Sequence, residues 1–179
     1  MSDTKSRLLD VAAGLAQTRG YHGFSFHDLA DAVGIKTASI HYHFPTKADL
    51  GRQMVQRYTG DFMDRLGPAD DGPPAACLTR YVTLFRVSLG QGRMCLCGMM
   101  GAEITGVPEA VLGDVQGFFA ANRDWLTQVM NRTKTPRPAL EAGIFLATLE
   151  GALMIARVCG DAAGFDAVAQ ACIDRITGR

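Results

Sequence analysis

The 179-residue sequence predicts an all-α protein. Apolar residues recur at three- and four-residue intervals throughout, and no run of strict alternation is long enough to indicate a β-strand. Glycine and proline interrupt this pattern at intervals, as expected between helices. With 47% hydrophobic and 20% charged residues, the composition is that of a folded protein with a sizeable core.

Four helices are predicted in the first 66 residues. Leu8, Ala12 and Leu15 share one face of the first helix, and Gly20 should end it because glycine readily adopts the left-handed turn after a helix. Thr46 with Asp49 is the capping-box pattern expected at the start of the fourth helix. The second and third helices are expected over 26–33 and 37–44, around a turn at Gly34-Ile35, and the fourth is marked by Leu50, Met54, Tyr58, Phe62 and Leu66.

A stretch rich in glycine and proline, residues 67–74, is the strongest break in the sequence. Both residue types disfavour the continuation of a helix. A second helical region follows, with helices expected over about 76–89, 94–105, 108–132, 139–158 and 165–176.

The net charge of zero is a sum of two unequal parts. Residues 1–60 hold seven Lys and Arg against five Asp, and the rest of the chain holds 11 Lys and Arg against 13 Asp and Glu. All four histidines also lie in the first part. The composition therefore excludes a uniformly basic or acidic protein but leaves a first part at +2.

The sequence predicts a soluble cytoplasmic protein. Its N-terminal residues are polar and lack the apolar core of a secretory signal. The most apolar stretch, 142–158, contains Glu150 and Arg157 and is shorter than the roughly 20 residues that cross a bilayer. The five cysteines are an odd number scattered through apolar surroundings, which is not a disulfide framework.

Residues 25–47 have the pattern of a helix-turn-helix. Leu29, Ala30 and Val33 supply the inner face of one helix, and Ile40 and Phe44 anchor the second. The outer face of the second helix carries short polar and basic side chains, which suit contacts with base edges and phosphates in the major groove. A helical hairpin that merely packs would not explain this clustering.

Residues 20–50 contain a set of short motifs at fixed spacing. They are Gly20-Tyr21-x-Gly23, Asp28-Leu29-Ala30-x-Ala32-Val33-Gly34-Ile35, Ile40-x-Tyr42-His43-Phe44 and Lys47-x-x-Leu50. With these residues the segment resembles the tetracycline-repressor (TetR) family of bacterial transcriptional regulators. The resemblance implies an all-α homodimer with a three-helix DNA-binding head, a connecting helix, and a C-terminal body that binds an effector and dimerises. On that basis we expect a DNA-binding domain over 1–48, a connecting helix and linker over 49–74, and a ligand-binding and dimerisation domain over 75–179.

The residues expected to contact DNA lie near two helix starts and along the recognition helix. Lys36 stands where the family often has a capping serine, so either Thr37 caps the helix or Lys36 contacts DNA. The position of His41, next to Tyr42, usually holds an aromatic residue in this family. The expected set is Ser25, His27, Lys36, Thr37, Ala38, Ser39, His41, Tyr42, His43, Thr46 and Lys47.

Large apolar residues of the second region are candidates for an effector pocket. Each of them could equally be plain core, but the resemblance implies that some face a cavity between helices, and such cavities are largely apolar. Adaptable methionines would suit an apolar or flat effector. The candidates are Tyr81, Phe85, Cys95, Met99, Phe118, Phe119 and Trp125.

The helix over 139–158 is apolar nearly all round and contains small residues that allow another helix to approach closely. We predict that it pairs, together with the helix over 165–176, with the same helices of a second subunit in a two-fold, four-helix interface. Packing within the core of one chain is the alternative. The residues expected at this interface are Leu140, Ile144, Ala147, Gly151, Ile155, Val168 and Cys172.

Residues 94–103 resemble a Cys-x-x-Gly segment followed by Ala-Glu, found in family members that respond to electrophiles or acrylate-type compounds. Three interpretations of Cys95 and Cys97 compete. They are buried small hydrophobes, reactive thiols that sense electrophiles or oxidants, or metal ligands. Metal binding is the weakest, because a one-residue gap with no nearby histidine is a poor zinc pattern.

The leading functional hypothesis is a repressor released from a near-palindromic operator when a small apolar or electrophilic effector binds the body. An activator of the same family fits the sequence equally well. A helical enzyme using a Cys-His pair is the alternative from another class, but no histidine follows His43 and the common catalytic and phosphate-binding motifs are absent. We therefore expect no catalytic residue, no cofactor and no metal.

Overall fold

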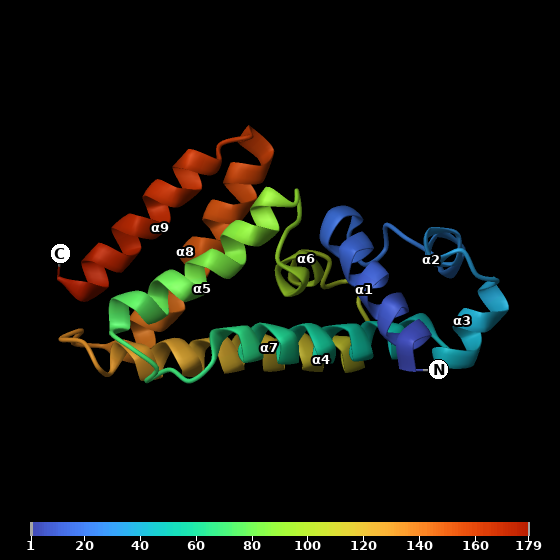
Figure 1. Cartoon of the computed structure of the whole chain (residues 1–179), viewed down its shortest axis with the longest axis horizontal. Coiled ribbons are helices and arrows are strands. Elements are labelled where there is room, and N and C mark those ends of the chain that lie inside the picture. The colour runs from blue at the N-terminus through green and yellow to red at the C-terminus, as the bar shows by residue number, and fades with distance from the viewer. Residues whose placement is uncertain (1, 179) are drawn as a thin grey trace. The chain divides into compact units, whose positions relative to one another are not determined.

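The computed structural model describes residues 2–178, which form helices and connecting turns without a β-strand, as predicted (Figure 1). The helices within this range are α1 (Ser2–Arg19), α2 (Phe26–Val33), α3 (Thr37–His43), α4 (Lys47–Leu66), α5 (Pro74–Gly90), α6 (Leu96–Ala102), α7 (Glu109–Met130), α8 (Pro138–Cys159) and α9 (Ala162–Thr177).

The helix boundaries follow the sequence signals closely, with one difference. Gly20 follows α1 with a φ of 86°, in the left-handed region predicted for it. The helix expected over 94–105 is shorter, because residues 103–106 form a turn in which the Gly106 amide donates to the Glu103 carbonyl at 3.0 Å. Glu103 therefore lies in a turn rather than within a helix.

The chain divides into two compact units. Residues 2–61 and Leu96–Phe118 form the first, which we call the head unit, and Phe62–Cys95 with residues 119–178 form the second, the body unit. This differs from the expected domains, because α6 and the first half of α7 group with the N-terminal helices. Arg52 and Gln56 of α4 illustrate the reason, since each donates a hydrogen bond of 3.0 Å to the Asp114 carboxylate of α7.

The head unit packs α1 against α2 and α6, and α2 against α3. Its core includes Leu8 of α1, Leu29 of α2 and Ile40 of α3, all fully buried. Arg57 of α4 adds a polar tie to α1, because its guanidinium lies 2.9 Å from the Asp10 carboxylate. The middle of α4 is thereby tied to α1.

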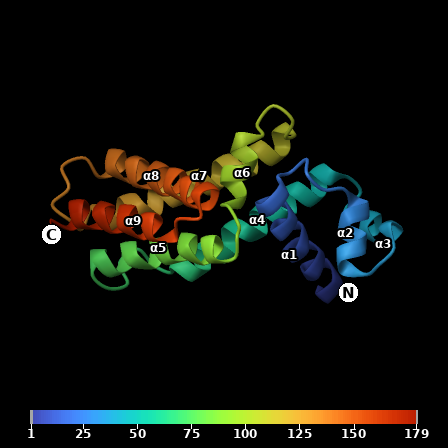
Figure 2. The same cartoon turned by 90° about the horizontal axis from the view of Figure 1, so that it is seen from above.

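The body unit packs α5, α8 and α9 against one another, and both views show these helices side by side (Figures 1 and 2). By length and composition alone, the 22-residue α8 could cross a membrane, since it is longer than the apolar stretch considered in the sequence. It packs against α5 and α9, however, and core helices of folded proteins have the same length and composition.

Candidate DNA-binding and effector sites

The helix-turn-helix rests on a buried apolar frame. Leu29, Ala30 and Val33 of α2 are buried, as are Ile40 of α3 and Phe44 directly after it. The turn between the helices has a left-handed glycine, with a φ of 75°, whose amide donates to the last turn of α2. The inner face predicted from the sequence is therefore confirmed.

Ser25 and Thr46 are both capping residues. The Ser25 hydroxyl accepts a hydrogen bond of 3.2 Å from the Asp28 amide, and the Asp28 carboxylate accepts one of 2.7 Å from the Ser25 amide. The hydrogen bond from the Ser25 side chain is the main cause that lowers the pKa of Asp28. Thr46 and Asp49 make the same reciprocal pair, at 3.0 and 3.1 Å, which confirms the capping box predicted for α4. Both helix starts are thus fixed locally.

Lys36 occupies the capping position of α3. Its backbone is extended and its side chain makes no capping hydrogen bond. Thr37 is the first residue of the helix, so the expectation that Thr37 caps α3 is wrong. Contact of Lys36 with DNA, the other alternative, stays a prediction.

The outer face of α3 is exposed, but its side chains differ in whether they contact the rest of the head unit. Tyr42 is 72% exposed, and Ala38 and Ser39 are also exposed. The His41 ring instead packs on Phe26, with centroids 4.9 Å apart. Tyr42 and Ser39 therefore project from the frame, whereas His41 is partly held by it.

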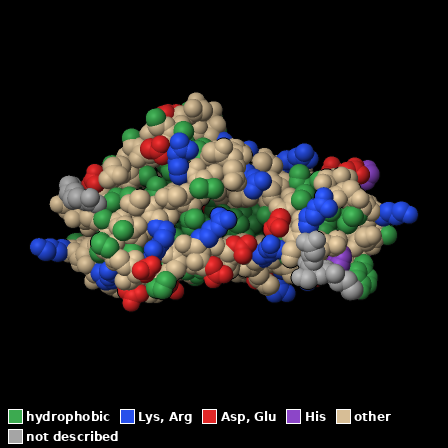
Figure 3. All heavy atoms as spheres, viewed as in Figure 1, with side chains coloured by type: hydrophobic (Ala, Val, Ile, Leu, Met, Phe, Trp, Pro, Cys, Tyr) green, Lys and Arg blue, Asp and Glu red, His purple; other side chains and the backbone are tan. Residues whose placement is uncertain are grey.

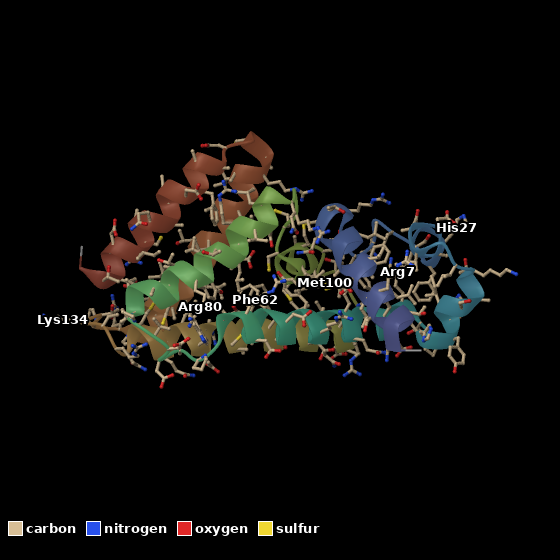
Figure 4. The ribbon with its side chains drawn as sticks, viewed as in Figure 1. Arg7, His27, Phe62, Arg80, Met100 and Lys134 are labelled. Atoms are coloured by element: carbon tan, nitrogen blue, oxygen red, sulfur yellow. The ribbon has the colours of Figure 1, made fainter. Side chains whose placement is uncertain are left out.

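Lys47 and His27 make contacts within the head unit. The Lys47 ammonium donates to the Phe24 carbonyl and lies 5.0 Å from the centroid of the Tyr21 ring. Burial lowers the pKa of Lys47. His27, labelled on α2 in Figure 4, lies 3.7 Å from the Asp31 carboxylate, and both side chains are exposed. Lys47 thus has a structural role that the sequence did not reveal, and phosphate contact by it stays a prediction.

An aromatic cluster surrounds Tyr81 in the body unit. The Tyr81 ring stacks on Phe85 and Trp125, with centroids 5.5 and 5.8 Å away, and meets the edges of Phe62 and Phe145. Figure 4 labels Phe62 among these side chains. Two of the effector candidates, Phe85 and Trp125, therefore contact a third, Tyr81, and all three are buried.

Polar groups adjoin this cluster. The Tyr81 hydroxyl donates to the buried Asn122 carbonyl oxygen at 2.8 Å. Glu150 of α8 accepts a hydrogen bond from the Cys95 thiol, and burial raises the pKa of Glu150 to about 7. Its Oε1 is buried without a hydrogen-bond partner. The sequence showed Glu150 only as a charge in an apolar helix, so its functional interest was missed.

The remaining effector candidates do not join one cluster. Met99 and Phe118 belong to the head unit, whereas Phe119 belongs to the body unit. The Phe118 ring contacts Tyr58 of α4, with centroids 5.5 Å apart. Phe118 is fully buried, and Met99 and Phe119 are partly buried.

Comparison with known proteins identifies the family. A family model described as bacterial regulatory proteins of the tetR family matches residues 8–54. A solved transcriptional regulator of the TetR family from Agrobacterium tumefaciens is 32% identical, with 98% of each chain covered and a TM-score of 0.92. The chain belongs to the TetR family. A TetR regulator from Legionella pneumophila is 30% identical to this family member, covering 99% of this chain and 98% of its own, with a TM-score of 0.93.

A curated relative of this TetR-family chain matches only its N-terminal part. The biofilm operon icaADBC HTH-type negative transcriptional regulator IcaR of Staphylococcus epidermidis is 34% identical over 62 residues. The match covers 35% of this chain and 34% of IcaR, so it spans about a third of the length of either protein.

The TetR-family body unit exposes an apolar stripe along α8. Ile144, Met154, Ile155 and Val158 are all large, apolar and exposed, and Val168 adds an exposed apolar side chain from α9. Ile144 and Ile155 lie eleven positions apart, close to three turns of helix, so they share one face across the small residues Ala147 and Gly151, and Val158 follows three positions later. Of the other predicted interface residues, Leu140 and Ala147 are exposed, and Gly151 and Cys172 are partly buried.

A hollow of about 760 Å³ lies elsewhere in the body unit, and it is lined by the start of α5, the connection from α7 to α8, and the end of α9. Several of the charged side chains that line it make ion pairs or hydrogen bonds within the chain. Arg175 pairs with Glu141 at 2.6 Å, and Arg132 donates to the Ala69 carbonyl at 2.6 Å. Lys134, also at this hollow, is labelled in Figure 4. None of the effector candidates lines it.

The cysteines of this family member differ in burial. Cys77, Cys95 and Cys97 are buried, Cys172 is partly buried and Cys159 is exposed. Burial of Cys95 and Cys97 favours the interpretation as small hydrophobes. Among residues 2–178, no group of three or more His, Cys, Asp or Glu is arranged to hold a metal ion.

Proposed function

We propose that this protein is a homodimeric repressor that binds a near-palindromic DNA operator in the cytoplasm. The observation that carries the proposal is the exposed outer face of α3, where Tyr42 and Ser39 project from a buried frame. Folding does not require such a face, whereas a recognition helix presents polar groups of this kind to base edges and phosphates. Repression, rather than activation, is supported by the name of the IcaR relative, which matches in this region.

The dimer is supported by the apolar stripe on α8 and α9. Ile155 is 64% exposed in the single chain, and Val158 more so. Burying such side chains against the same face of a second copy removes them from water and closes the interface by two-fold symmetry. Two recognition helices would then enter successive major grooves about 34 Å apart, so each half of the operator mirrors the other.

The effector is proposed to be a small apolar or electrophilic compound that binds the body unit near Tyr81. The aromatic side chains there suit an apolar or flat compound, and an electrophile reaches the buried Cys95 thiol only when the body unit opens locally. Such an effector releases DNA if it binds more tightly to the conformation that does not fit the operator.

Selection of DNA fragments tests this proposal directly. The full-length protein is incubated with a random double-stranded pool, and bound fragments are sequenced after several rounds. We expect a near-palindromic sequence to be enriched and to bind with strong salt dependence. A pool that stays unenriched would overturn the proposal. A reporter gene placed behind the selected operator then distinguishes repression from activation.

Mixed surface charge agrees with this design. Lys and Arg side chains alternate with Asp and Glu over the visible face (Figure 3). The net charge of the whole chain is zero, so it gives no overall attraction to DNA, and binding depends on local groups of the recognition helix.

A further inference from the structure

Two segments that lie far apart in the sequence are in contact in the head unit. One is Gly20-Tyr21, at the end of α1, and the other is Glu103, directly after α6. The Glu103 Oε2 accepts hydrogen bonds from the backbone amides of Tyr21, at 2.7 Å, and His22, at 3.2 Å. Met100, labelled in Figure 4, marks the position of α6 in this view. A single carboxylate thus holds the chain where it leaves α1 for the DNA-binding helices.

The backbone on both sides is shaped for this contact. Gly20 has a positive φ, and a Cβ at its position would collide with the Glu103 carboxylate. A Cβ at Gly106 would likewise crowd the His22 ring. Glycine is therefore needed at position 20, where φ is positive, whereas the exposed His22 ring can move aside from a Cβ at position 106.

Tyr21 extends this contact to the start of α4. Its hydroxyl donates to the Lys47 carbonyl at 3.0 Å, and the Lys47 ammonium lies over its ring. The negative charge of Glu103 raises the pKa of Lys47 and so opposes burial, which lowers it more strongly. Because α3 ends at His43, just before Lys47, both ends of the helix-turn-helix are linked through Tyr21 to Glu103.

We propose that Glu103 is the positioning residue through which α6 holds the recognition helix in its DNA-binding orientation. The inference rests on the proposed function and names the residue that orients its recognition helix. Glu103 immediately follows the last residue of α6, and loss of its two hydrogen bonds frees the end of α1.

Three variants of the full-length protein test this positioning role. Glu103→Ala removes both hydrogen bonds, and Glu103→Gln keeps an acceptor without the charge. Glu109→Gln is the matched control, because it removes the same charge from an exposed residue of the head unit. Amide hydrogen exchange at Tyr21 and His22, thermal unfolding, and affinity for the fragment selected by the wild-type protein are measured for each.

We expect exchange at these two amides to rise about tenfold or more in Glu103→Ala and less in Glu103→Gln, since bonds to charged groups are the stronger ones. Operator affinity should fall about tenfold or more in Glu103→Ala, within the range of typical couplings, when it is measured at a temperature where the variant and the control are both fully folded. The unfolding temperature should fall as well, because two hydrogen bonds to a charged group are lost. A merely structural residue would lower the unfolding temperature but leave the operator affinity of the folded protein unchanged.

The outcomes separate this inference from the proposed function. Equal operator affinity of Glu103→Ala and wild type, or unchanged exchange at Tyr21 and His22, overturns the positioning role and leaves the repressor assignment standing. Failure of the wild-type protein to enrich any DNA overturns the proposed function, and the inference with it.

Discussion

The Cys95 thiol donates a hydrogen bond to the Glu150 carboxyl inside the body unit. Burial raises the pKa of Glu150 from 4.5 to about 7, and the hydrogen bond from Cys95 opposes that rise. One oxygen of the carboxyl has no partner. The charge of this buried group therefore changes near neutral pH, where an ordinary glutamate is fully ionised.

The stability of the body unit should depend on the protonation of Glu150. Because its pKa is higher in the folded than in the unfolded state, its contribution to stability is fully present below about pH 4.5 and is lost as the pH rises through 7. Between pH 4 and pH 8, the wild type should lose about 3 kcal/mol more unfolding free energy than Glu150→Gln. Urea unfolding at equal protein concentration measures this difference.

Comparing the wild type with Glu150→Gln cancels the pH dependence that the other titrating groups contribute to stability. Asp28, whose lowered pKa gives the opposite pH dependence, is present in both proteins. Parallel pH profiles of the wild type and Glu150→Gln would show that Glu150 titrates normally and that its burial is relieved in solution.

Cys95 should be the thiol through which an electrophile acts. Its side chain is 2% exposed, so modification waits on local opening and should be slow. Once modified, it can no longer donate to Glu150, and we expect release from the selected operator. N-ethylmaleimide should release the wild type and Cys159→Ser, which lacks only the exposed thiol, but not Cys95→Ser. An unaltered response of Cys95→Ser removes Cys95 from the mechanism.

Tyr42 and Lys36 should contribute differently to DNA affinity. Tyr42→Ala should weaken binding to all sequences by about tenfold without changing the salt slope, because its hydroxyl is neutral. Lys36→Ala should lower the slope of log affinity against log salt by about 0.9, the value for one phosphate contact. Gel shifts over a salt series measure both. Identical slopes for Lys36→Ala and the wild type would place Lys36 away from the phosphates.

Ser39 should affect which sequence is bound rather than how tightly DNA is bound in general. Its exposed hydroxyl on α3 is short enough to meet a base edge, so Ser39→Ala should change the preferred base at one position of each half-site. Repeating the fragment selection with this variant measures the change. A selected sequence identical to that of the wild type would exclude a base contact by Ser39.

The sequence predicted features that depend on neighbouring residues and missed those that depend on packing. The Thr46–Asp49 capping box and the glycine that ends α1 were predictable because each needs only a few adjacent residues. The contact between Glu103 and Tyr21 joins residues 82 positions apart, and no local pattern signals it. The burial of Glu150 was equally hidden, since a charge in an apolar helix can face either solvent or core.

The dimer should depend on the apolar stripe of α8. Ile155→Glu places a carboxylate on this face and should convert the protein to a monomer at micromolar concentration, because an unpaired charge buried in an interface is costly. Ile104→Glu is the matched control, since Ile104 is 60% exposed but lies in the turn after α6. Sedimentation velocity should show a monomer for the first variant and a dimer for the second. A wild-type monomer, or dimers of both variants, would place the interface elsewhere or exclude it.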